Sequence, residues 1–153
     1  MYFELITIPC LSDNYAFILY NARNRSALLV DAPEAAPINE TLTKNNLNLE
    51  KIFLTHHHAD HINGLDGILD KHNALTIGAQ ADIHRLPKLD KYVRAGDDFS
   101  FQGQTGKIFD VSGHTKGHIA LYIPAQNILF SGDSLMALGC GRLFEGSAAQ
   151  MWN

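Results

Sequence analysis

Histidine and aspartate side chains are concentrated in residues 55–61, with the sequence Thr-His-His-His-Ala-Asp-His. Imidazole nitrogens and carboxylate oxygens suit zinc and similar divalent ions, and a catalytic ion needs such ligands plus an open position for water. In an extended chain successive side chains point to opposite sides. His56 and His58 can therefore share one ion, while His57 points away. The segment predicts a hydrolytic metal site.

Asp60 and His61 stand at a different point of the backbone. Apolar residues recur at helical intervals over residues 62–71, which predicts a helix there. We expect Asp60 and His61 at the start of this helix, where they could serve a second ion. The alternative is a polar helix cap, in which Asp60 caps the helix and the imidazoles are solvated.

Two further candidate ligands, His114 and Asp133, each follow an expected apolar strand and lie beside glycine. His114 would complete the ligand set of the first ion with His56 and His58, and the two carboxylate oxygens of Asp133 could bridge both ions. A hydroxide held between two ions is a strong nucleophile at neutral pH, because each ion lowers the pKa of bound water and polarises the carbonyl under attack. We expect this metal-bound hydroxide to be the catalytic group.

Short strands must position most of these side chains. Strands are predicted over residues 3–8, 15–20, 27–31, 51–55, 75–78, 99–101, 107–111, 119–123 and 127–130. Helices are predicted over residues 37–45, 62–71 and 81–86. The polar turn at residues 21–24 predicts an antiparallel meander at the start of the chain. The apolar strand 51–55 is expected to deliver the histidine cluster to a sheet edge, where α/β sites usually form.

These motifs resemble the metallo-β-lactamase superfamily and, within it, the glyoxalase II branch, the hydroxyacylglutathione hydrolases. The resemblance extends from residues 9–15 through residues 29–31 and the His-x-His-x-Asp-His signature to Gly-Cys-Gly-Arg-Leu-Phe-Glu-Gly at residues 139–146. The signature is typical of the superfamily, and the glycine-rich run is typical of this branch. The resemblance implies an α/β (α+β) fold, the αββα sandwich, as one domain over residues 1–153.

The resemblance also implies a role for each candidate residue. The implied metal ligands are His56, His58 and His114 on one ion, Asp60 and His61 on the other, and Asp133 bridging both. The ions are implied to be zinc, although iron and manganese accept similar ligand sets. Arg142 and Phe144 are implied to contact the glutathione part of a substrate, which agrees with the affinity of a guanidinium for carboxylates.

The activity implied is metal-dependent hydrolysis of S-(2-hydroxyacyl)glutathione thioesters, such as S-lactoylglutathione, to glutathione and a 2-hydroxy acid. Family chains continue beyond the equivalent of Asn153 with a further strand, a last histidine ligand and a helical glutathione-binding region. Residues 148–152 look like the start of a helix, and no histidine follows His118. We therefore expect a truncated chain with an incomplete second sheet, in which the second ion binds weakly.

Other functions stay open at this point. One alternative is an inactive or weakly active remnant that binds metal and needs a C-terminal partner segment. Lactamase, nuclease and sulfur dioxygenase chemistry are further options within the superfamily. The acidic balance disfavours a nuclease, Asp60 and the missing secretion signal disfavour a lactamase, and the glycine-rich run disfavours a dioxygenase.

Composition predicts one folded, soluble domain. The chain has 153 residues, of which 46% are hydrophobic and 18% charged, enough for a single core. A net charge of −4 argues against a nucleic-acid surface. No window approaches the roughly 18 apolar residues of a membrane span, and no signal peptide is evident, so a cytoplasmic location is expected. We expect a monomer or self-association through an exposed sheet edge.

Four other residues are weaker candidates. Asp31 either orients a metal ligand or forms a turn before Pro33. His118 is expected to serve in packing. Cys10 and Cys140 are too few for a disulfide framework, which favours a reducing compartment, and Cys140 is expected to be a structural thiol instead of a nucleophile.

Overall fold

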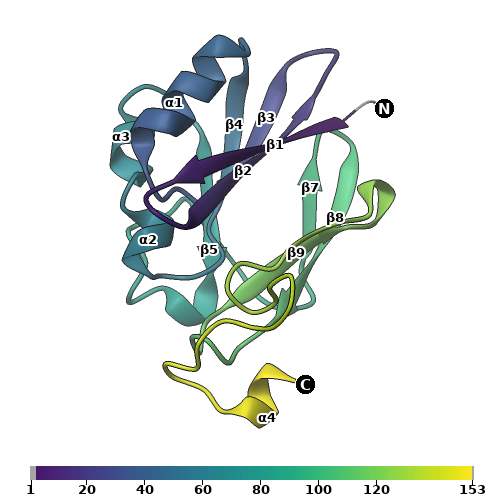
Figure 1. Cartoon of the computed structure of the whole chain (residues 1–153). Coiled ribbons are helices and arrows are strands. Elements are labelled where there is room, and N and C mark those ends of the chain that lie inside the picture. Colours follow the sequence, from purple (N-terminus) through teal and green to yellow (C-terminus); the bar gives the residue numbers. More distant parts are fainter. Residues whose placement is uncertain (1–2, 153) are drawn as a thin grey trace. The chain divides into compact units, whose positions relative to one another are not determined.

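A computed structural model describes residues 3–152 of the chain (Figure 1). These residues form two compact units. The first contains residues 3–54 and 58–77, and the second contains residues 55–57 and 78–152. The boundary between the units therefore passes through the histidine cluster, between His57 and His58.

The first unit is built on strands that are joined partly by hairpin and partly by crossover. Its elements are β1 (Phe3–Cys10), β2 (Asn14–Asn21), β3 (Ser26–Val30), α1 (Ala35–Lys44), β4 (Asn48–Phe53), α2 (Ala59–Ile62), α3 (Leu65–Leu69) and the start of β5 (Leu75–Ala79). The strand order is β1-β2-β3-β4-β5. The first three strands are antiparallel, as the expected meander requires, and β3, β4 and β5 are parallel.

Parallel strands need a crossover connection, and the helices of this unit supply it. Helix α1 connects β3 to β4, whereas α2 and α3 connect β4 to β5. Figure 1 shows α1 and α3 beside each other on the same side of this sheet. Ile38 and Leu42 of α1 are buried with Leu28, Leu29 and Ile52 of the strands, which forms the core of the unit.

The second unit contains an antiparallel sheet with the order β10-β9-β8-β7. Its elements are the end of β5, the 3₁₀ helix η1 (Gln80–Asp82), β6 (Lys91–Val93), β7 (Asp98–Phe101), β8 (Gln104–Asp110), β9 (Ile119–Ile123), the 3₁₀ helix η2 (Pro124–Gln126), β10 (Ile128–Phe130) and α4 (Ala148–Met151). Alternate residues of β8 are buried up to Ile108, so one face of the sheet packs on the core of this unit.

The structure contains a strand at each place where one is predicted, and the ends shift by a few residues. Strand β4 ends at Phe53, so Leu54 and Thr55 lie beyond the strand that we expected to include them. Helix α1 confirms the prediction for residues 37–45, and α4 confirms the expected helical start at residues 148–152. The strand β6 was not predicted, because it has three residues of which only Val93 is buried.

Two helix predictions are wrong. The segment 62–71 contains the end of one short helix and a second short helix, because the Gly64 N–H donates to the Ala32 carbonyl at 2.8 Å instead of to a carbonyl of the preceding helical turn. The segment 81–86 contains only the end of η1 followed by turns. Pro87 comes next, and a proline disfavours the helical conformation of the residue before it.

In the described part of the chain, none of the helices combines the length and the apolar character that crossing a bilayer requires.

The two cysteines lead to a prediction about thiol reactivity. Cys10 is 3% exposed and burial raises the pKa of its thiol, whereas Cys140 is exposed. Because the thiolate is the reactive form, we expect Cys140 to react with Ellman's reagent in the native chain and Cys10 only after unfolding. The measurement is a thiol titration with and without guanidinium chloride. Cys140→Ser should remove the rapid reaction that the native chain shows with the reagent. Rapid reaction of two thiols in the native chain would contradict the burial of Cys10.

Gly64 leads to a prediction about stability. A Cβ at this position would lie 2.7 Å from the backbone nitrogen of Ala35 and 2.9 Å from the carbonyl oxygen of Ala32. Backbone atoms cannot move aside easily, so we expect Gly64→Ala to destabilise the chain by about 1–3 kcal/mol. The matched control is Gly139→Ala, because a Cβ at Gly139 meets nothing within 4 Å. Urea unfolding of both variants measures the difference, and equal midpoints would refute the expectation.

Candidate metal centre

The six expected metal ligands are divided equally between the two units. The second unit contains His56, His114 and Asp133, and the first unit contains His58, Asp60 and His61. Each set is therefore described within its own unit.

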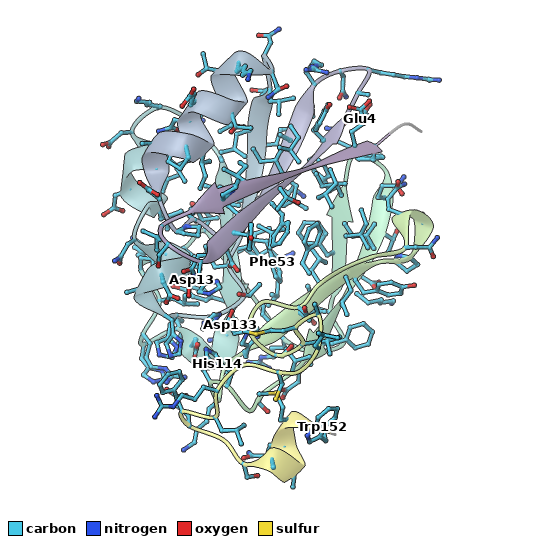
Figure 2. All side chains as sticks on the ribbon, viewed as in Figure 1. Glu4, Asp13, Phe53, His114, Asp133 and Trp152 are labelled. Atoms are coloured by element: carbon cyan, nitrogen blue, oxygen red, sulfur yellow. The ribbon has the colours of Figure 1, made fainter. Side chains whose placement is uncertain are left out.

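His56 and His114 face each other in the second unit. They are 0% and 3% exposed, and their ring centroids are 5.0 Å apart. Each offers a ring nitrogen within 4.8 Å of the other. The Nε2 atom of His114 lies 3.4 Å from a carboxylate oxygen of Asp133, and Figure 2 labels both side chains. The structure thus brings together the three expected ligands of this unit.

The backbone around these residues fixes the orientation of their rings. The Ile119 N–H donates to the Thr55 carbonyl at 3.0 Å, which ties the start of the histidine cluster to β9. The Nδ1 of His114 lies 2.6 Å from the Arg142 carbonyl oxygen. A carbonyl only accepts, so the proton is on Nδ1 and the lone pair is on Nε2, the atom that faces Asp133.

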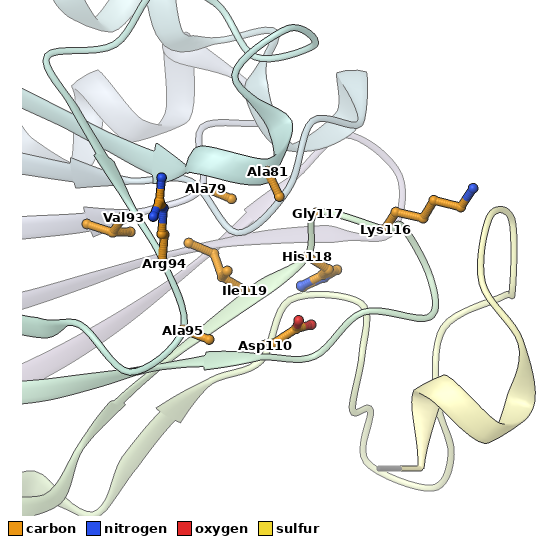
Figure 3. Close-up of a pocket in the computed structure, with 10 residues that line it drawn as sticks. All are labelled: Ala79, Ala81, Val93, Arg94, Ala95, Asp110, Lys116, Gly117, His118 and Ile119. Carbon is orange, nitrogen blue, oxygen red and sulfur yellow. The ribbon is translucent and has the colours of Figure 1, made fainter.

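His118 packs as expected, and it also contacts two expected ligands. Its ring is 1% exposed and stacks on His56 with a centroid distance of 4.5 Å. Its Nε2 accepts the backbone N–H of Asp133 at 3.1 Å. A Cβ at Gly132 would lie 2.7 Å from this ring, so the close approach requires glycine. Figure 3 shows His118 on the wall of a pocket of about 270 Å³ in the second unit.

His57 differs from its neighbours in the cluster. Its Nδ1 lies 2.9 Å from a carboxylate oxygen of Asp82, and its Nε2 lies 3.7 Å from Glu145. This agrees with the expectation that His57 turns away from His56. Asp82 was not recognised from the sequence, because 25 residues separate it from His57 and it was placed in a helix.

In the first unit, Asp60 and His61 lie in α2, as predicted. His61 is 5% exposed, and its Nδ1 lies 2.9 Å from Asp31, which is 2% exposed. Of the two expectations for Asp31, the structure supports the one in which it orients a candidate ligand. The Nε2 of His61 lies 3.8 Å from Asp60, whose carboxylate accepts a hydrogen bond from Asn14 at 2.9 Å.

The alternative of solvated imidazoles is wrong for His56 and His61, whereas His57 and His58 are half-buried. His56, His61 and His114 are all buried. Imidazole nitrogens and carboxylate oxygens of this kind suit a divalent ion such as zinc, iron or manganese. The donor set and the orienting hydrogen bonds therefore fit a divalent metal ion.

The residues that were expected to contact a substrate border His114. The Phe144 ring lies 5.3 Å from the His114 ring in an edge-on contact, and the Arg142 guanidinium lies 5.1 Å from the Phe144 ring. Phe144 is 58% exposed, which leaves this pair accessible to a ligand. Cys140 in the same run is exposed, so it does not pack as a core thiol.

The sequence profile of the metallo-beta-lactamase superfamily matches residues 16–151 of the chain. A hydroxyacylglutathione hydrolase from Ruegeria pomeroyi is 52% identical over 149 residues, which are 97% of this chain and 58% of that protein. A hydroxyacylglutathione hydrolase from Roseobacter denitrificans is 52% identical over 150 residues, which are 98% of this chain and 59% of that protein. The chain thus spans less than two thirds of the length of these relatives.

Solved structures show the same fold. The BLEG-1 B3 metallo-beta-lactamase matches with a TM-score of 0.89 and 23% identity, over 97% of this chain and 81% of that one. ETHE1 from Myxococcus xanthus matches with a TM-score of 0.79 and 26% identity, over 99% of this chain and 67% of that one. The expected α/β fold class is confirmed. With a profile match over most of its length, the chain belongs to the metallo-β-lactamase superfamily.

Proposed function

We propose that the chain hydrolyses S-(2-hydroxyacyl)glutathione thioesters, such as S-lactoylglutathione, to glutathione and a 2-hydroxy acid. The observation that carries this proposal is the 52% identity, over 97% of the chain, to a protein named hydroxyacylglutathione hydrolase. The exposed Arg142 and Phe144 beside His114 support it further, because a guanidinium next to an aromatic ring suits a substrate with carboxylates.

The proposed metal is zinc, in two sites with different numbers of ligands. The assigned ligands are His56, His58, His114 and Asp133 for the first ion, and Asp60, His61 and the shared Asp133 for the second. Chain connectivity supports the pairing of His56 with His58, because the Cα atoms of residues two positions apart in a chain are at most about 7 Å from each other. The first ion has four ligands and the second has three, so the first is expected to bind more tightly.

The residues of the chain have separate tasks in this reaction. Bound divalent ions supply Lewis acidity and lower the pKa of water. The Arg142 carbonyl keeps the His114 ring in one tautomer, and Asp31 does the same for His61. Arg142 and Phe144 hold the glutathione part. The leaving group is a thiolate with a pKa of about 8.5, so its departure needs no strong general acid.

Two further expectations belong to this proposal. A cytoplasmic location is tested by cell fractionation. A monomer, or self-association through an edge strand such as β1 or β10, is tested by light scattering. Both strands stand at the end of a strand order, where unpaired backbone groups can accept a partner strand.

The activity is tested by thiol release from S-lactoylglutathione. We expect the zinc-loaded chain to release glutathione and to lose this activity after chelation. A chain that binds zinc but releases no thiol would refute the proposed hydrolysis. Activity that appears only when a C-terminal segment is added would instead establish the alternative, a metal-binding remnant that needs a partner segment.

The ligand assignment is tested by elemental analysis after dialysis. We expect one tightly held ion per chain. Loss of a hydrogen-bond partner of a ligand already costs about 10- to 100-fold in metal affinity, so His114→Ala should cost at least about 100-fold. The matched control is His84→Ala, an exposed histidine of the same unit, which should leave the affinity unchanged. Equal losses in both variants, or none, would contradict the assignment of His114.

A further inference from the structure

Asp82 is a charged side chain buried in the second unit. It lies at the end of η1 and is 0% exposed. One of its oxygens lies 2.9 Å from His57 Nδ1, and the other accepts from Arg85 Nε at 3.1 Å and from Arg85 Nη2. A buried carboxylate is costly unless it is paired and hydrogen-bonded, and both oxygens of Asp82 meet this requirement.

Arg85 extends the contacts of Asp82 to the glycine-rich run. Its Nη1 donates to Glu145, which belongs to residues 139–146. Burial alone would lower the pKa of Arg85, but the hydrogen bonds with Asp82 and Glu145 outweigh burial and raise the pKa above its ordinary value. The guanidinium therefore remains charged and bridges two carboxylates with its planar fork of donors.

Glu145 in turn contacts the loop after His114. Its second carboxylate oxygen accepts the Lys116 backbone N–H at 2.7 Å. Burial would raise the pKa of Glu145, but the hydrogen bonds from Lys116 and Arg85 outweigh it and lower the pKa. Glu145 is thus an anion that holds this loop next to its own run.

Gly117 allows the same loop to pass over Asp82. A Cβ at position 117 would lie 2.0 Å from a carboxylate oxygen of Asp82, well inside van der Waals contact. Figure 3 shows Gly117 next to Lys116 on this loop. The segments that carry His57, Lys116 and Glu145 therefore all meet at Asp82 and Arg85.

From these contacts we infer that Asp82 and Arg85 are positioning residues, which fix the segment of His56 and the loop of His114 relative to the run of Arg142 and Phe144. Asp82 acts on His56 through the neighbouring His57. Arg85 acts on the glycine-rich run through Glu145. The inference rests on the proposed function in one respect, because that proposal makes His56 and His114 metal ligands and makes the run of Arg142 and Phe144 the substrate contact.

The physical reason is the precision that a metal site needs. Ligands must be held within about 0.5 Å of the productive geometry, by neighbours whose own conformations are fixed. His57 lies directly after His56, so an imidazole anchored to a fully buried carboxylate restricts the backbone of both residues. Partners of this kind contribute about 10- to 100-fold to metal affinity.

The first test uses Asp82→Asn in the full chain without metal. The amide oxygen can still accept a hydrogen bond from Arg85 but carries no charge, so Arg85 is held less firmly. Glu145, which accepts from Arg85 and from the Lys116 N–H, is then fixed less firmly as well. We expect the Lys116 amide to exchange with deuterium at least about tenfold faster. The matched control is Asp98→Asn, the same change at an exposed ion pair with Lys107 in the same unit, which should leave Lys116 unchanged. Unchanged exchange in folded Asp82→Asn would overturn the inference.

The second test measures zinc affinity by competition with a chelator. Asp82→Asn should bind zinc about tenfold more weakly, and Asp98→Asn should bind it like the parent chain. Wild-type affinity in Asp82→Asn would overturn the link to His56. If Asp82→Asn speeds Lys116 exchange but the parent chain binds no zinc, the hydrogen-bond network of Asp82 and Arg85 is supported and the proposed function is refuted.

A third variant covers the case in which Asp82→Asn does not fold. Arg85→Lys keeps the charge but cannot reach both carboxylates, because an ammonium lacks the planar fork. We expect it to speed Lys116 exchange and to raise the KM for S-lactoylglutathione several-fold with little change in kcat. Exchange and KM like those of the parent chain in Arg85→Lys would overturn the role of Arg85. A several-fold fall in kcat with unchanged KM would contradict an action through the run of Arg142 and Phe144.

Discussion

Two buried carboxylates hold the histidine cluster in place, one in each unit. Asp31 lies 2.9 Å from His61 Nδ1, and Asp82 lies 2.9 Å from His57 Nδ1. Their relative exposures are 2% and 0%, so each needs a charge-compensating or hydrogen-bonded partner to remain inside the fold. Each imidazole supplies that partner and is oriented in return. In the second unit, the Arg142 carbonyl orients His114 and the His118 ring stacks on His56, so further contacts within that unit position its candidate ligands.

The sequence was sufficient to predict every strand of the described residues except β6, and it singled out the candidate metal ligands. Strands follow from short apolar runs between turn residues, and His56, His114 and Asp133 stand out by type and by their place after such runs. The interrupted helix at Gly64 was missed because its cause is a hydrogen bond to Ala32, far away in sequence. Periodicity describes one segment at a time, so it contains no information about a neighbouring loop.

The pairing of Asp82, Arg85 and Glu145 could not be predicted for the same reason. Arg85 and Glu145 are 60 residues apart, and an aspartate followed by an arginine three residues later is typical of an ordinary exposed helix surface. Burial decides the difference, and burial depends on tertiary structure. His118 shows the opposite case, because the sequence indicated packing correctly but could not reveal that its partners are His56 and the backbone of Asp133.

The contact between Gly117 and Asp82 links the two positions in any exploration of sequence. A side chain at position 117 has no space while a carboxylate occupies position 82, and a shorter residue at 82 removes one of the two carboxylate partners of Arg85. Neither position can then vary alone without a loss. Substitutions at the two positions are therefore epistatic, because a side chain at position 117 finds space only when the residue at position 82 is shorter.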